Sequence, residues 1–118
     1  MVEFGDFLRE RRTALQQARG RAFSLRQVAG RIGMQPSYLS RIERGTDIPP
    51  SEEKLIGLAR ELDLDPDVVL AMAGKVSSEL QEIIRKRPQL FSDLIRQLKD
   101  VPDEAVLSIV REVRDGEW

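Results

Sequence analysis

Apolar residues recur every three to four positions along most of the chain, which is the spacing of one face of a helix. No segment combines a strict alternation of apolar and polar residues with the β-branched residues that strands favour. Proline and glycine residues divide the chain into short segments, and capping residues precede several of these. The pattern therefore predicts an all-α fold.

The most regular pattern lies between Ser24 and Gly45, where the sequence reads SLRQVAGRIGMQPSYLSRIERG. Ser24 is suited to cap a helix, and the apolar residues of that helix follow at helical spacing: Leu25, Val28, Ala29 and Ile32. Gly33 can adopt the left-handed conformation that closes a helix, and Pro36 fits the first turn of the next one. We therefore predict two short helices that are joined by a tight turn.

The second of these helices has two chemically different faces. Leu39 and Ile42 form an inward apolar face, and Gly45 ends the helix. The other face is polar at helical spacing and consists of Ser37, Ser40, Arg41 and Arg44. This polar face is the candidate binding surface of the chain.

Further helices are predicted on both sides of this pair. A first helix over roughly residues 3 to 18 turns an apolar face toward the core. Residues 16 to 23 then form an extended basic loop that carries Arg19 and Arg21. Capping and proline signals between residues 51 and 74 predict a fourth and a fifth helix, both with a structural role.

The stretch that ends in Tyr38-Leu39-Ser40-Arg41-Ile42-Glu43-Arg44-Gly45 resembles the helix-turn-helix of the phage repressor and Cro family, also called the XRE family. Four residues match the family's small residue, turn glycine, buried aliphatic residue and stop glycine at the expected separations: Ala29, Gly33, Leu39 and Gly45. The resemblance covers roughly residues 4 to 74. It implies a five-helix DNA-binding domain in which the second helix of the pair is the recognition helix.

The resemblance also implies roles for individual residues. An arginine of the family's first helix commonly pairs with the glutamate in the last turn of the recognition helix, and these positions are Arg12 and Glu43 here. The alternative is that both are solvated charges that add almost no stability. The candidate DNA contacts are Arg26, Gln35, Ser37, Tyr38, Ser40, Arg41 and Arg44, together with Arg19 and Arg21 of the basic loop.

Arg41 is the residue that we expect to read the DNA sequence. Its guanidinium matches O6 and N7 of guanine, whereas Arg44 in the last turn is expected to approach the phosphates. Ser37 discriminates poorly because its hydroxyl both donates and accepts. Tyr38 lies beside this face, and either contacts DNA or packs beside Met34.

The sequence departs from the family pattern on both sides of the recognition helix. Leu25 stands where many members carry a glutamine that bonds a phosphate, and Arg26 beside it can replace that contact. Asp47 stands where the family often has basic residues that approach the DNA backbone. No phosphate contact is therefore predicted at position 47.

The positive charge of the chain is concentrated in its first half. Residues 1–50 hold nine arginines, no lysine and five acidic residues, a net charge of +4. Residues 51–118 hold 10 basic and 15 acidic residues, a net charge of −5. A basic half that contains a helix-turn-helix is suited to attract phosphates. The alternative is that surface charges cluster there by chance.

The composition excludes several classes of function. The chain has no cysteine and no histidine, which removes disulfides, thiolate chemistry, the common zinc sites and a histidine general base. Acidic residues and arginines are scattered without paired carboxylates or a phosphate-cradling loop, so we expect no enzyme, no metal and no cofactor. No membrane-spanning run or signal peptide is recognisable, and we expect a cytoplasmic protein.

After the resemblance ends, three further helices are predicted, over residues 79–87, over residues 89–99 and from Pro102 onward. Their apolar stripes need a surface that covers them. Either this tail folds back on the first domain and adds to its core, or it forms a helical hairpin that dimerises or binds another protein. We divide the chain into a DNA-binding domain at residues 1–75 and a dimerisation or regulatory segment at residues 76–118.

These patterns and the resemblance predict a sequence-specific regulator that binds double-stranded DNA as a homodimer and represses a promoter by excluding polymerase. The contrasting class is an antitoxin-type protein, in which residues 76–118 bind a partner protein while the first domain represses their shared promoter. Co-purification with the product of a neighbouring reading frame would favour that second class.

Overall fold

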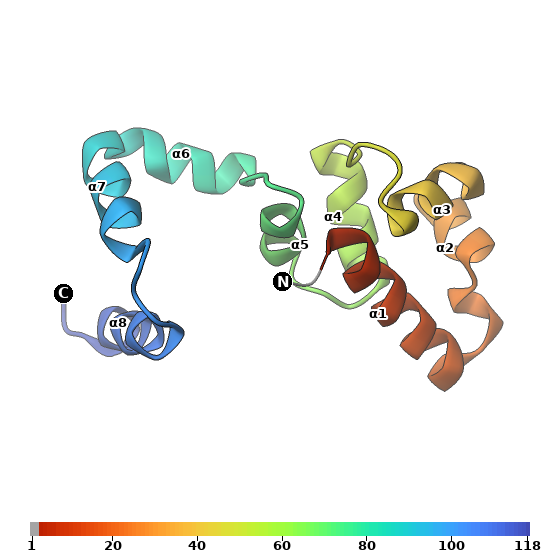
Figure 1. The fold of residues 1–118 in the computed structure, drawn as a ribbon, viewed down its shortest axis with the longest axis horizontal. Helices are drawn as coiled ribbons and strands as arrows, with labels where there is room; N and C mark the ends of the chain where they lie inside the picture. Colours follow the sequence, from red (N-terminus) through yellow and green to blue (C-terminus); the bar gives the residue numbers. More distant parts are fainter. Residues whose placement is uncertain (1–2) are drawn as a thin grey trace. The chain divides into compact units, whose positions relative to one another are not determined.

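The computed structural model describes residues 3–118, so residues 1 and 2 of the predicted DNA-binding domain lie outside the described residues. Within residues 3–118 the chain forms eight α-helices, one short 3-10 helix and no strand, which confirms the all-α prediction. The chain divides into two compact units, and the division falls between Ser77 and Ser78. Figure 1 shows both units along the chain.

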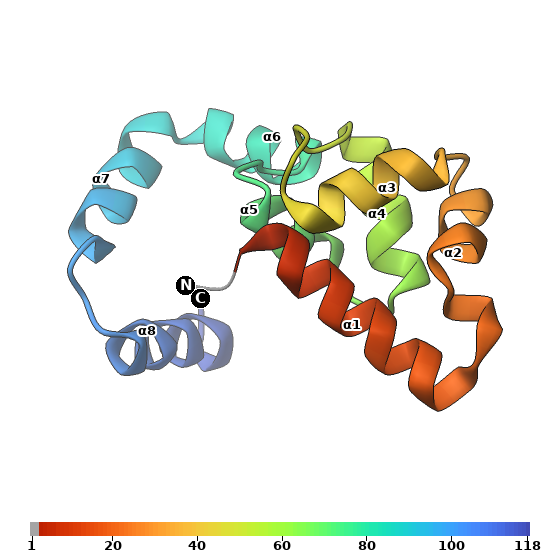
Figure 2. The same cartoon turned by 45° about the vertical axis from the view of Figure 1, so that its right-hand side comes forward.

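The first unit contains five α-helices, as the resemblance implies. They are α1 (Phe4–Arg19), α2 (Leu25–Arg31), α3 (Pro36–Arg44), α4 (Glu52–Glu61) and α5 (Pro66–Met72), with the 3-10 helix η1 (Arg21–Phe23) between α1 and α2. Both α1 and α2 pack against α3, and α4 packs against α5 (Figure 2). The helix-turn-helix is therefore held by α1 from one side.

The core of the first unit is aliphatic and draws on all five α-helices. Its largest fully buried side chains are Leu8, Leu39, Leu55, Leu58, Leu62 and Leu70. Full burial of a leucine side chain stabilises a fold by about 1.5–3 kcal/mol. Leu39 is 0% and Ile42 is 2% exposed, so the predicted inward face of α3 is confirmed.

Three predicted helix caps are present in the first unit. The side chains of Ser24, Ser51 and Asp65 each accept a hydrogen bond from a backbone N–H group of the following helix, those of Gln27, Lys54 and Asp67. A cap of this kind satisfies one of the backbone donors that a helix start leaves without a partner. The starts of α2, α4 and α5 are therefore encoded locally.

The predicted extended loop between α1 and α2 is wrong. α1 continues to Arg19, and η1 covers Arg21–Phe23, so Gly20 is the only residue between 16 and 23 that lies outside a helix. Residues 16 to 19 are Gln, Gln, Ala and Arg, which all favour a helix, and nothing interrupts them before the glycine. The Phe23 ring lies 5.8 Å from the guanidinium carbon of Arg19 and 5.6 Å from that of Arg31.

The second unit contains α6 (Ser78–Lys86), α7 (Pro88–Leu98) and α8 (Asp103–Asp115). These helices confirm the three predicted segments to within one or two residues. None of residues 78–118 is buried. Their exposed apolar side chains are Leu80, Ile83, Leu90, Leu94, Ile95, Leu107, Ile109, Val110 and Val113.

Trp118 is 90% exposed, and its indole N–H donates a 2.7 Å hydrogen bond to the carbonyl oxygen of Val113.

Among the helices described between residues 3 and 118, none has the length and apolar character that a membrane crossing requires.

Candidate nucleic-acid interface

The turn between α2 and α3 is closed by backbone hydrogen bonds and by one lysine. Gly33 has a φ of 68°, in the left-handed region that favours glycine. The N–H of Met34 donates to the carbonyl of Ala29 over 2.9 Å. Lys54 Nζ reaches from α4 and donates to the carbonyls of Ile32 and Gly33 over 2.8 and 3.3 Å. These contacts fix the angle at which α3 leaves the turn.

Sequence reasoning missed the role of Lys54 in this turn. Lys54 lies three positions after the Ser51 cap, and its local sequence does not distinguish it from a solvated lysine in the first turn of a helix. Its partners are carbonyl oxygens 22 and 21 residues away in the chain. No local pattern encodes a contact over that separation, so only the tertiary structure could reveal it.

The polar face of α3 is accessible in the first unit. Ser37 and Arg44 are exposed, and Ser40 and Arg41 are half-buried. Gln35 is the residue before the helix and is also exposed. The structure therefore places five of the candidate contacts on α3, namely Ser37, the half-buried Tyr38, Ser40, Arg41 and Arg44.

Arg41 is held from two directions. Its Nε donates to a carboxylate oxygen of Asp47 over 3.0 Å, and its guanidinium carbon lies 5.7 Å from the centre of the Tyr38 ring. The Arg41 hydrogen bond, and next a bond from the backbone N–H of Ile48, hold the pKa of the Asp47 carboxyl below its usual range. Asp47 is therefore ionised at neutral pH.

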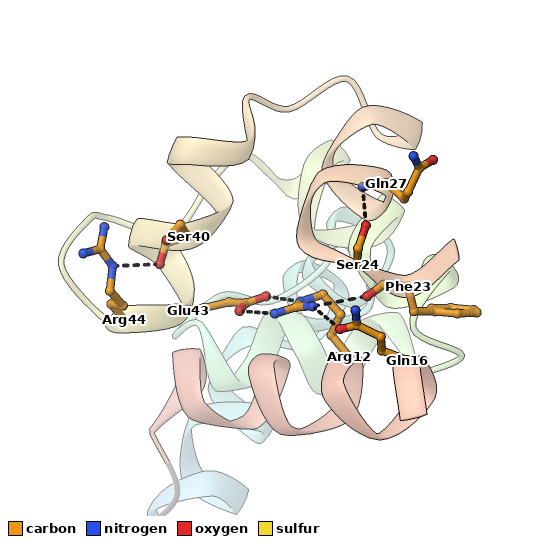
Figure 3. Close-up of polar contacts among 8 residues, drawn as sticks. All are labelled: Arg12, Gln16, Phe23, Ser24, Gln27, Ser40, Glu43 and Arg44. Carbon is orange, nitrogen blue, oxygen red and sulfur yellow. Dashed lines mark hydrogen bonds and ion pairs between the residues drawn. The ribbon is translucent and has the colours of Figure 1, made fainter. Parts of the chain in front are cut away.

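Arg44 and Glu43 are neighbours in the chain but point to opposite sides of α3. Figure 3 shows Arg44 on the outer side, where its Nε donates to the Ser40 carbonyl over 3.4 Å. Glu43 points inward toward α1 and is 4% exposed. In the last turn of α3, Arg44 is therefore open to solvent, whereas Glu43 is buried against α1.

Arg12 and Glu43 form a two-pronged ion pair between α1 and α3 (Figure 3). Arg12 Nε and Nη2 donate to the two carboxylate oxygens over 2.7 and 3.0 Å. Arg12 Nη1 donates to the Phe23 carbonyl over 3.2 Å and to the Gln16 side chain over 3.3 Å. Both charges are buried, and each nitrogen of the Arg12 guanidinium and both carboxylate oxygens of Glu43 take part in a hydrogen bond, so this pair joins α1, η1 and α3 at one point.

Gly5 allows α1 to cross α3 at close range, and sequence reasoning did not single it out. A Cβ atom at this position would lie 2.5 Å from the carbonyl oxygen of Ile42 and 2.6 Å from that of Glu43. Such distances are well inside van der Waals contact. The absence of a side chain at Gly5 is therefore a condition for the position of α3.

The remaining candidate arginines differ in their surroundings. Arg26 is exposed in the first turn of α2, and Arg21 is exposed in η1. Arg19 is exposed in the last turn of α1 beside the Phe23 ring. Leu25, where the family often has glutamine, instead packs against the core. Among residues 3–118 there is no cluster of acidic side chains that could hold a metal ion.

Comparison with known proteins agrees with this geometry. Residues 3–72 match the family model described as a helix-turn-helix domain, which covers more than half of the chain. No curated protein and no solved structure matched the chain. A helix-turn-helix domain indicates DNA binding and transcriptional regulation. The chain therefore belongs to the helix-turn-helix domain family.

Proposed function

We propose that this chain is a sequence-specific DNA-binding regulator of the XRE and Cro type, which represses transcription by occupying a promoter operator as a dimer. The observation that carries this proposal is the polar face of α3. It is exposed on a helix that is fixed by the Arg12 and Glu43 pair and by Lys54 at the preceding turn. A rigid helix with an accessible polar face suits insertion into the major groove.

Arg41 reads the operator in this proposal, and Arg44 anchors the helix to the DNA backbone. Arg41 is the sixth of the nine residues of α3, three positions before Arg44, and has the reach to donate to both acceptors of a guanine. Arg44 is exposed in the last turn, where a recognition helix leaves the groove. Arg26, which is exposed in the first turn of α2, supplies a further phosphate contact.

The second unit supplies the dimer contact in this proposal. Its three helices bury no side chain, and Leu94, Ile95 and Val110 are 47, 60 and 50% exposed. Apolar surface of this kind is stabilised when a second surface covers it. The start of α6 is acidic and its end is basic, with Arg85 and Lys86 in the last turn, so two antiparallel copies of α6 bring opposite charges together.

The same exposed apolar faces also support a second candidate, the binding of a different protein by residues 78–118. The antitoxin-type function belongs to this candidate. A chain that sediments as a monomer alone, and forms a stable complex with the product of a neighbouring reading frame, would favour it over the homodimer.

Selection of binding sites from random duplex DNA tests the proposed function. The full chain should enrich a short inverted repeat whose half-sites lie about 34 Å apart, because a two-fold dimer places its recognition helices about one DNA turn apart. A pool in which no sequence is enriched over the input, at a salt concentration that suppresses non-specific binding, would contradict the proposal.

A further inference from the structure

The loop that follows α3 is hydrogen-bonded to residues of that helix. The backbone N–H of Thr46 donates to the Arg41 carbonyl over 3.0 Å, and the Tyr38 hydroxyl donates to the Ile48 carbonyl over 3.1 Å. Asp47 lies between these two anchors. Its carboxylate accepts from Arg41 Nε over 3.0 Å and from the Ile48 N–H over 2.8 Å. The backbone therefore sets the position of this carboxylate.

Arg41 uses only one edge of its guanidinium in this network. Nε faces Asp47, and the Tyr38 ring lies beside the guanidinium carbon. The terminal nitrogens Nη1 and Nη2 make no hydrogen bond to any residue that the structure describes. These two nitrogens can donate together to O6 and N7 of one guanine, which is the commonest specific contact of an arginine in the major groove.

We infer that Asp47 determines specificity: it holds Arg41 by the Nε edge, so that the edge formed by Nη1 and Nη2 is presented to one guanine of the operator. Asp47 is a positioning residue in this role, because it acts through Arg41 and touches no base. The inference rests on the proposed function, since it requires α3 to enter the major groove.

Asp47 has two effects on DNA binding, and their signs are opposite. A carboxylate near the DNA backbone repels phosphates and weakens binding to every sequence. A side chain that is already fixed before binding loses less rotamer entropy, and for one flexible side chain this corresponds to about a two- to tenfold gain in affinity. Only DNA with the guanine in place receives that gain. Asp47 therefore lowers general affinity and raises discrimination.

The ion pair between Arg41 and Asp47 contributes little to the stability of the fold. The side chains of Arg41 and Asp47 are 43 and 31% exposed, and exposed ion pairs contribute little to folding. Removal of the Asp47 side chain should therefore leave a folded protein. A change in sequence discrimination can then be measured without a change in the melting temperature.

The test uses the full chain and the half-site obtained by selection from random DNA. Dissociation constants are measured for the selected duplex and for the same duplex with the contacted guanine replaced by adenine. Asp47→Ala should lower the preference for guanine over adenine by about two- to tenfold while it strengthens binding to unrelated duplex DNA. Asp47→Asn keeps an oxygen that can accept from Arg41 Nε, so it should retain more of the preference.

Two control variants separate positioning from charge and from loop structure. Glu10→Ala removes one exposed negative charge from α1 and should leave the guanine preference unchanged. Thr46→Ala removes the hydrogen bond from the Thr46 hydroxyl to the Arg41 carbonyl but keeps Asp47 and the Tyr38 ring beside Arg41. Its effect on the preference should be smaller than that of Asp47→Ala.

The outcomes separate this inference from the proposed function. An unchanged preference in Asp47→Ala overturns the inference, and an increased preference would show that Asp47 withholds Arg41 from the DNA. If Arg41→Ala keeps the guanine preference, the assignment of Arg41 as the reading residue fails and the inference fails with it. If the unaltered chain enriches no sequence at all, the proposed function itself is wrong.

Discussion

The two units of the chain show the same helical periodicity in their sequences but differ in what holds their helices. In the first unit, α1 to α5 enclose a core of fully buried leucine and valine side chains. In the second unit, none of residues 78–118 is buried. α6, α7 and α8 have 9, 11 and 13 residues, and isolated helices shorter than about 12–15 residues are marginal in water.

In the proposed function, this difference assigns DNA binding to the first unit and dimerisation to the second. The first unit has its own core and can present α3 without help. The helices of the second unit need an apolar surface to cover them, and in our proposal that surface is a second copy. A regulator built in this way couples its DNA affinity to its assembly, because a dimer contacts both half-sites at once.

Truncation after Ser77 should have the largest effect. The first unit should remain folded, because its core residues all precede the cut and because Lys75 Nζ still donates to the Pro50 carbonyl over 3.0 Å. Operator affinity should fall by about 10²–10⁴-fold, since the advantage of two linked half-site contacts is lost. Sedimentation and titration with labelled operator measure the two properties separately.

A substitution in the second unit provides the matched control for this truncation. Leu94→Asp should leave the melting temperature of the first unit unchanged and should weaken the dimer. A truncated chain that still sediments as a dimer would show that residues 78–118 are not the interface.

Loss of the Arg12 and Glu43 pair should have the largest effect within the first unit. Arg12→Ala and Glu43→Ala should each destabilise the fold by about 3–5 kcal/mol, because each leaves a buried charge without its partner. Denaturant unfolding of both single variants and of the double variant should give a coupling energy of about 0.5–3 kcal/mol. A coupling near zero would mean that the pair does not join α1 to α3.

Gly5→Ala should destabilise the fold by an intermediate amount and should weaken DNA binding. The added methyl group meets two backbone carbonyls of α3, so α1 must move away at a cost of about 1–3 kcal/mol. Gly30→Ala is the matched control, because a Cβ at this exposed helical position meets nothing within 4 Å. It should raise stability by up to about 1 kcal/mol. Equal effects of the two variants would argue against the close crossing at Gly5.

The smallest expected effect concerns Arg19, in the last turn of α1, and Arg21, in η1. If Arg21 contacts the DNA backbone, Arg21→Ala should make the dependence of log affinity on log salt concentration shallower by about one unit. Arg19→Ala should do the same, with an additional loss of the contact to the Phe23 ring. A slope that neither variant changes would leave the segment from Arg19 to Arg21 as a structural connection only.

The fold could be predicted from the sequence where the signals are local. Ser24, Ser51 and Asp65 mark helix starts through bonds to backbone groups two or three residues away. Gly33 and Gly45 follow the last turns of α2 and α3 with φ values of 68° and 74°. The local signal is ambiguous at Gly20, because a glycine is typical both of a loop and of the single residue that here separates α1 from η1.

The candidate site could be predicted only in part, because several of its contacts join distant residues. The pattern marked Asp47 as a departure from the family, but it could not show that the carboxylate meets Arg41 six residues earlier. Lys54 contacts a carbonyl 22 positions away in the chain, and Gly5 lies against carbonyls 37 and 38 positions away. Contacts of this range depend on how the helices cross.

Site selection with Arg41→Ala and Arg44→Ala tests most directly the claim that the exposed face of α3 reads DNA. Arg41→Ala should lose the preference for one guanine in each half-site, a discrimination of about 1–3 kcal/mol. Arg44→Ala should weaken binding to all sequences alike and keep the selected motif. A guanine preference that stays unchanged in Arg41→Ala would contradict the account.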